Sequence, residues 1–175
     1  MNLSSVTIIT GFIFIVSATS AFAYYYQYGY NLHSIPYKVE NSTGAWYFQE
    51  AAKHWKNAVG TNIYETGSSN RVELESSNHS WYGLYNPNII GGKAASFRIT
   101  VNSKKLAQDF GDGKHAAWEA IVSTAVHESG HAQYLDDYKK GSGMGKISIM
   151  SHERVRTTMY KPQTHDINNI RNLRK

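Results

Sequence analysis

Apolar residues recur with helical spacing in two parts of the 175-residue chain, and a third part between them is apolar nearly throughout. Residues 45–59 carry an apolar stripe along one face, and Gly60 follows as a helix stop. Residues 116–126 are mostly apolar and contain neither Pro nor Gly, which predicts a buried helix with Asp112 as its N-cap. Residues 162–173 begin with a proline and place three aliphatic residues on one face, which predicts a C-terminal helix.

Short strands are predicted between the first and second of these helices. Residues 62–65 and 71–75 have strand composition, and the second segment alternates cleanly between polar and apolar positions. Residues 97–102 alternate in the same way and are expected to form a half-buried strand. The stretch 76–95 is rich in Ser, Asn and Gly and is expected to be an irregular loop region. Together these elements predict an α+β fold.

The first 23 residues differ from the rest of the chain. An apolar run over 6–16 is followed by a small-x-small triplet ending at Ala23, which is typical of an export signal cleaved there. Retention as an N-terminal anchor is the alternative, because the apolar part is close to the shortest length that spans a membrane. We therefore expect three parts: a signal peptide or anchor (1–23), a tyrosine-rich segment (24–37) and one domain (38–175).

The charge balance narrows the possible partners. The formal net charge is +5 and no charged side chain precedes Lys38, so all of this charge belongs to the part expected outside the cell. A basic surface favours association with an anionic cell wall or membrane. Lys and Arg are scattered and no nucleic-acid-binding motif is present, so we expect no nucleic-acid partner. The absence of cysteine fits an exported bacterial protein.

Three residues at the end of the second predicted helix form an HExxH motif: His127, Glu128 and His131. Residues four apart on a helix project from one face, so both imidazoles can bind one Zn²⁺ ion. Glu128 then lies beside the metal, where a carboxylate can take a proton from water. Three other histidines lack a partner at ligand spacing and are expected on the surface: His33, His79 and His115.

A catalytic zinc ion needs a third protein ligand, and three carboxylates are candidates. Asp137 lies six residues after His131, where the extended pattern HExxHxxGxxH places its last ligand. Asp136 is its neighbour and a possible substitute. Glu153 is the alternative if the third ligand comes from a later helix, as in the gluzincins.

Three features make the chain, over roughly residues 38–175, resemble the metzincin clan of zinc endopeptidases. These are the extended motif, the segment 148–151, which is similar to the clan's Met-turn, and the C-terminal helix, which looks like that of a matrixin. The small bacterial snapalysins share an aspartate as third ligand. The resemblance implies a small twisted mixed sheet with an active-site helix and a C-terminal helix, and residues 97–102 as the sheet edge along which a peptide lies.

The resemblance also assigns roles to residues near the motif. Met150 would support the metal site from below. His152 stands where some metzincins carry a tyrosine, so it is a candidate donor to the transition-state oxyanion, with a solvated loop histidine as the alternative. The clan's glycine is Tyr134 here, and a bulky residue at positive φ costs about 1–2 kcal/mol. This leaves open a turn built differently, with Asp136 in place of Asp137.

These observations predict an extracellular or cell-surface, monomeric zinc metalloendopeptidase with protein or peptide substrates. Glu128 would be the general base, and the ligands would be His127, His131 and Asp137. A protein that keeps the fold and binds zinc or a cell surface without catalysis is the alternative. The intact Glu128 argues against it, because a purely structural site needs no base there.

Overall fold

The computed structural model describes residues 25–111 and 116–175. The expected export signal (1–23), the expected N-cap Asp112 and His115 therefore lie outside the described residues. Within the described ranges, no helix combines the length and apolar character needed to cross a membrane.

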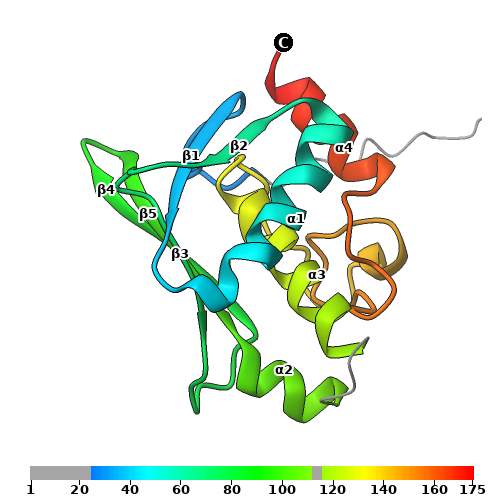
Figure 1. Cartoon of the computed structure of the whole chain (residues 1–175). Coiled ribbons are helices and arrows are strands. Elements are labelled where there is room, and N and C mark those ends of the chain that lie inside the picture. Colours follow the sequence, from blue (N-terminus) through cyan, green and yellow to red (C-terminus); the bar gives the residue numbers. More distant parts are fainter. Residues whose placement is uncertain (1–24, 112–115) are drawn as a thin grey trace, which may run out of the picture.

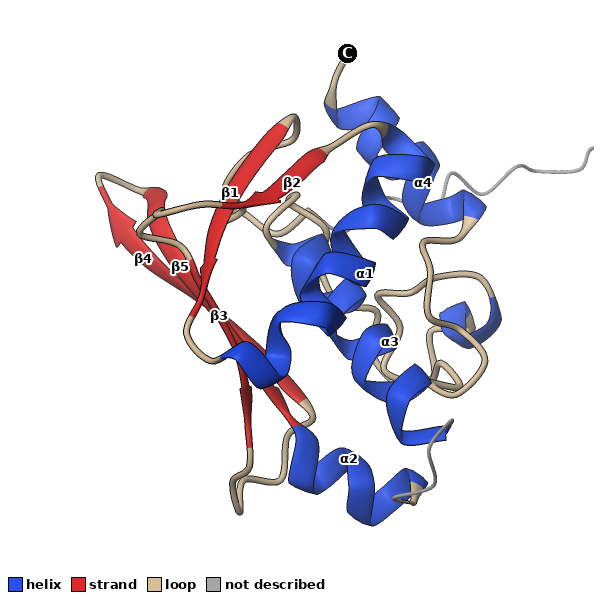
Figure 2. Cartoon of the chain, viewed as in Figure 1, coloured by secondary structure: helices blue, strands red, loops and turns tan. Residues whose placement is uncertain are grey.

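The fold is a mixed sheet covered on one side by helices, as Figures 1 and 2 show. The sheet order is β2-β1-β3-β5-β4, in which all neighbours are parallel except β5 and β4, which are antiparallel. The strands are β1 (Ser34–Val39), β2 (Asn62–Glu65), β3 (Arg71–Glu75), β4 (Gly83–Ile90) and β5 (Lys93–Asn102). The helices are α1 (Ser42–Val59), α2 (Ser103–Phe110), α3 (Ala116–His131) and α4 (Thr164–Leu173), with a 3₁₀ turn at Met144–Lys146. The predicted α+β class is confirmed.

Helices α1 and α3 pack against each other between the sheet and α4. Helix α1 begins three residues earlier than predicted, because the Asn41 side chain accepts a hydrogen bond from the Gly44 backbone N–H and caps it. Gly60 ends the helix in the left-handed conformation, as predicted. Trp55 is fully buried, and its indole N–H donates to the Val126 carbonyl at 2.9 Å. This bond ties α1 to the turn of α3 that carries the HExxH motif.

The loop predicted for residues 76–95 is confirmed over 76–82 and wrong beyond it, and the predicted sheet edge was wrong. Residues Gly83–Ile90 form β4, which joins β5 through a hairpin whose turn residues, Gly91 and Gly92, have φ of 60° and 78°. Strand β5 therefore lies between β3 and β4, and β4 is the outer strand. Pro87 lies within this strand, because an edge strand tolerates a residue without an N–H.

The tyrosine-rich segment packs on the domain as an N-terminal strap, which we define as residues 25–31. The strap lies along the end of α3: the Tyr26 N–H donates to the Tyr134 carbonyl at 2.8 Å, and the Tyr30 N–H to the Ala132 carbonyl at 2.8 Å. Strand β1 starts three residues after the strap and enters the sheet. The strap thus contacts the C-terminal end of α3 and then leads into β1.

The contact of Gly29 with Tyr134 generates a stability prediction. A Cβ atom on Gly29 would lie 2.6 Å from the Tyr134 backbone nitrogen, so Gly29→Ala should force the strap away from the turn. We expect the free energy of unfolding to fall by about 1–3 kcal/mol, the usual cost of overpacking. Chemical denaturation measures this free energy of unfolding.

Gly67→Ala is the matched control, because a Cβ there meets nothing within 4 Å. It should leave the stability unchanged or raise it by up to about 1 kcal/mol. Equal stability of the two variants would show that the strap is not packed against Tyr134.

Candidate metal centre

The last turns of α3 bring the two histidines of the motif to one point. His127 and His131 are both buried, with 5% and 7% of their surface exposed. One ligand atom from each, together with one from Asp137, forms a group in which all atoms lie within 4.8 Å of one another. Among the described residues, no second group of three or more His, Cys, Asp or Glu side chains converges in this way.

Backbone carbonyls orient both imidazole rings. His127 Nδ1 lies 2.9 Å from the Ile149 carbonyl, and His131 Nδ1 lies 2.7 Å from the Leu135 carbonyl. A carbonyl oxygen can only accept, so each Nδ1 carries the proton and each Nε2 keeps its lone pair. This is the arrangement that metal-binding histidines use, with the outer nitrogen held by an acceptor.

The Asp137 carboxylate completes the group. Its Oδ1 lies 3.1 Å from His127 Nε2 and 3.6 Å from His131 Nε2. This oxygen is buried and has no hydrogen-bond partner among the described residues. An anionic oxygen facing two lone pairs is unfavourable unless a cation lies between them. The donor set of two imidazoles and one carboxylate therefore fits Zn²⁺, with a fourth position open to the cleft.

A left-handed turn at Tyr134 delivers Asp137 to the histidines. Tyr134 has φ of 68° and is the only non-glycine residue with positive φ in the described chain. The Leu135 N–H donates to the Gly130 carbonyl, and the Tyr134 N–H donates to the His131 carbonyl, which together form a Schellman motif. The alternative of a differently built turn was therefore wrong: the tyrosine adopts the conformation usual for glycine.

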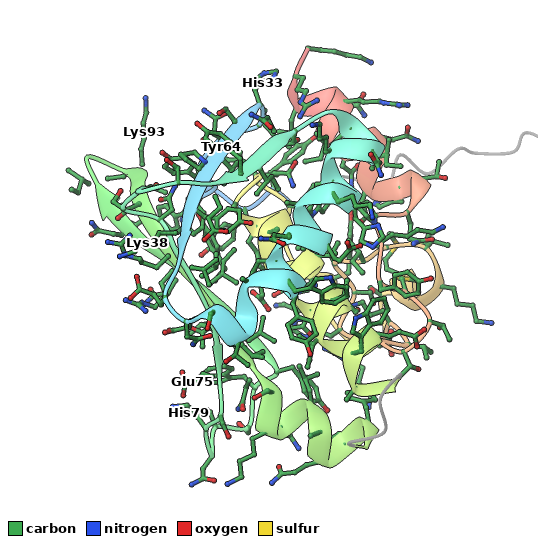
Figure 3. The ribbon with its side chains drawn as sticks, viewed as in Figure 1. His33, Lys38, Tyr64, Glu75, His79 and Lys93 are labelled. Carbon is green, nitrogen blue, oxygen red and sulfur yellow. The ribbon has the colours of Figure 1, made fainter. Side chains whose placement is uncertain are left out.

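The other two candidate ligands lie elsewhere. The Asp136 carboxylate accepts the Asp137 backbone N–H at 2.8 Å, so it stabilises the segment that presents Asp137. Glu153 is exposed and outside the group. His33 and His79 are exposed at opposite ends of the molecule, as Figure 3 shows.

Met150 lies directly beneath α3. It is buried, and a Cβ atom on Gly130 would come within 2.5 Å of its sulfur, so only glycine allows the helix to approach this closely. The segment that contains Met150 also supplies the Ile149 carbonyl that orients His127. Met150 therefore packs against the end of α3 that carries the two histidines.

Asp166, in the first turn of α4, holds this Met150 segment in place. Its carboxylate accepts hydrogen bonds from the Ser148 hydroxyl at 2.6 Å and from the Ile149 N–H at 2.9 Å. It also accepts from the Gln163 N–H at the start of α4. Sequence reasoning missed this residue, although an acid in the first turn of a helix is a recognisable capping signal.

Glu128 lies beside the ligand group rather than within it. Its two carboxylate oxygens lie 3.9 Å from His127 Nε2 and 4.0 Å from His131 Nε2. Burial, and secondarily the charge of Asp137, raise the pKa of Glu128 to about 8 in the metal-free protein. Gly83, the first residue of β4, packs against this side chain so closely that a Cβ there would contact the carboxylate.

His152 stands at the edge of the site. Its Nε2 lies 3.1 Å from Asp137 Oδ2, the oxygen that faces away from the other two histidines, and about half of its side chain is exposed. Sequence reasoning placed His152 near the metal but did not foresee this contact.

The group opens into a cleft of about 540 Å³. Aromatic residues from the strap and from residues 81–85 line its walls: Tyr26, Trp81, Tyr82 and Tyr85. Two arginines that sequence reasoning missed, Arg154 and Arg156, also line it. Arg154 is buried, which lowers the pKa of its guanidinium to about 9. The side chain therefore keeps its charge at neutral pH.

Comparison with known proteins identifies the fold. No protein-family model matches the chain, and no curated protein sequence matches it. A chain of the GM1-bound ECX AB5 holotoxin shares the fold with a TM-score of 0.58 and 17% identity, over 88% of this chain and 87% of that one. Archaemetzincin from Methanopyrus kandleri matches with a TM-score of 0.53 and 12% identity, over 83% of this chain and 98% of that one.

A third structure, the hatching-enzyme zinc protease HCE-1 from Oryzias latipes, aligns at 12% identity over 86% of this chain and 94% of that one. Its TM-score of 0.47 adds no weight to the argument. At identities this low, the likenesses establish the fold alone. The chain has a zincin-like fold, as the sequence predicted.

The ligand geometry predicts which carboxylate controls metal affinity. Asp137→Ala should weaken zinc binding by more than about a hundredfold, because loss of a direct ligand costs more than the 10–100-fold typical of outer residues. Competition with a chromogenic chelator measures the affinity.

Glu153→Ala removes an exposed carboxylate outside the group and should leave zinc affinity unchanged. If Glu153→Ala weakens binding and Asp137→Ala does not, the ligand assignment from this geometry is wrong.

Proposed function

We propose that this protein is a zinc-dependent endopeptidase. The observation that carries the proposal is the convergence of His127, His131 and Asp137 on one point, beside a buried Glu128 and open to a cleft. A purely structural metal site is closed by four protein ligands, whereas a catalytic site keeps one position open. The zincin-like fold supports the same assignment by analogy.

The outer strand β4 is suited to hold an extended peptide. It lies at the edge of the sheet, so its outer backbone N–H and C=O groups are not engaged by another strand (Figure 1). Its first residues, Gly83, Leu84 and Tyr85, line the cleft that contains Glu128. A peptide added along this edge would be held through its backbone, with little demand on its sequence.

The residues around the metal position then have separate tasks. A bound zinc ion supplies Lewis acidity, which polarises the scissile carbonyl and makes water a nucleophile near neutral pH. Glu128 accepts the proton of the attacking water and later delivers it to the leaving amine. His152 lies at the cleft wall, where it donates a hydrogen bond to the developing oxyanion.

The decisive variant is Glu128→Gln. It removes the base while keeping the shape of the side chain, so turnover of an unstructured protein such as casein should fall by about 10²–10⁴-fold. Zinc content should remain that of the wild type, because Glu128 is not in the ligand group. Chelation should abolish wild-type activity, and added zinc should restore it.

Glu153→Gln, which changes an exposed carboxylate, is the control and should retain full turnover. His152→Ala is the second arm of the assay and should lower kcat more than it lowers zinc affinity. Zinc binding without hydrolysis by the wild type would favour the non-catalytic alternative. Unchanged kcat in His152→Ala would remove only the role of that histidine.

We propose that hydrolysis takes place outside the cell. The support is the apolar run and the small-x-small triplet within residues 1–23. The intact mass of the protein recovered from a culture medium should correspond to a chain that begins at Tyr24. A mass that retains residues 1–23 would indicate an anchored or unprocessed protein.

A further inference from the structure

We propose that the cleft selects peptides that carry a carboxylate side chain, and that Arg154 and Arg156 bind this carboxylate. The inference rests on the proposed function, because it names the substrate class of the same cleft. Both arginines line the cleft together with His127, Glu128 and Asp137. A substrate that reaches the metal position therefore lies against them.

Neither guanidinium forms an ion pair with a carboxylate in the described part of the chain. Two arginines of the sheet behave differently: Arg71 lies 2.7 Å from Glu40, and Arg98 lies 3.0 Å from Glu73. Charged side chains that are buried are normally paired, because an isolated buried charge is costly. Arg154 is buried and Arg156 is half-buried, so both lack, among the described residues, the carboxylate partner that burial favours.

Arg154 is held in a defined position without being neutralised. Only 4% of its surface is exposed. Its Nε donates to the Ser123 hydroxyl at 3.1 Å, and one terminal nitrogen donates to the Ser151 carbonyl at 2.9 Å. Both acceptors are uncharged, so the positive charge remains available to a ligand.

The Arg156 guanidinium lies over an aromatic ring and has a hydrogen-bond donor that no described residue uses. Its guanidinium carbon lies 4.3 Å from the centre of the Tyr82 ring, within the range of a cation–π contact. The Tyr82 hydroxyl donates to Asp109, which also pairs with Lys105 at 2.9 Å, so the ring is itself held. The Arg156 Nε is buried and has no hydrogen-bond partner among the described residues.

The charge of the metal site strengthens this argument. Asp137 faces the same cleft, and its negative charge partly offsets the two arginines at longer range. A divalent cation held by Asp137 would outweigh this negative charge and leave the arginines uncompensated. A carboxylate matches the forked geometry of guanidinium donors and would relieve the repulsion between the two arginines.

The test compares peptides that differ by one charge. In a fluorogenic library, a single Asp is placed at each position on either side of the cleaved bond, and each peptide has an Asn counterpart. For the wild type, kcat/KM should favour Asp over Asn by about ten- to a hundredfold at one position, as expected for a charge-assisted hydrogen bond. Arg156→Gln should reduce this ratio to near one.

Two further variants secure the interpretation. Lys93→Gln removes the same charge at the start of β5, at the hairpin end of the sheet away from α3 (Figure 3), and should keep the wild-type ratio. Arg156→Glu should shift the preference at that position from Asp to Lys. Arg154 is less suitable for substitution, because its hydrogen bonds hold the segment after Met150 in place.

Binding of the same peptides to the zinc-loaded Glu128→Gln protein separates this inference from the proposed function. Tighter binding of the Asp peptide, lost in the Glu128→Gln/Arg156→Gln double variant, would support the inference even if the wild type cleaves nothing. Equal kcat/KM and equal binding for Asp and Asn peptides would overturn it. Cleavage without discrimination would leave the endopeptidase proposal intact.

Discussion

The left-handed turn at Tyr134 is the constraint on which the metal centre depends. Helix α3 can present two histidines by its own periodicity, but the third donor comes from a chain that must reverse direction within six residues. The Tyr134 side chain makes this reversal costly by about 1–2 kcal/mol. The strap offsets that cost, because Tyr26 donates to the Tyr134 carbonyl and the Tyr134 hydroxyl donates to the Tyr30 carbonyl at 3.3 Å. A segment far away in sequence therefore belongs to the support of the metal site.

The two imidazoles connect this turn to the rest of the fold. His131 is oriented by the Leu135 carbonyl just after the turn, and His127 by the Ile149 carbonyl of the Met150 segment. That segment is held in turn by Asp166 at the start of α4. Because the N-terminal strap and the C-terminal helix both act on ligand orientation, metal affinity and global stability should be coupled in this protein.

Much of the fold and of the candidate site could be predicted from local patterns. Helix α1 and strand β3 have strong periodicity, α3 is a long apolar run, and β2 has strand composition. The HExxH spacing is a local property of one helix. Strand β4 could not be predicted, because its Pro and Asn residues are tolerated only at the sheet edge, which is a property of the whole topology. Asp166 carries a local signal as a helix cap, but its bonds to the Met150 segment depend on partners distant in sequence. The roles of Arg154 and Arg156 likewise depend on distant surroundings that no local pattern reveals.

The two proposals about the cleft are linked by charge. Without metal, the Asp137 carboxylate partly balances Arg154 and Arg156, so an acidic peptide meets a smaller excess of positive charge. With a divalent cation in place, the same peptide enters a cleft whose arginines are uncompensated, so its affinity rises. Thermodynamic linkage then requires that an acidic peptide raise the affinity for the metal by the same factor. The arginines lie outside the ligand group. Arg156 therefore changes the linkage between peptide affinity and metal affinity through its charge alone, and the metal ligands stay the same. Selectivity for acidic peptides would therefore depend on metal occupancy.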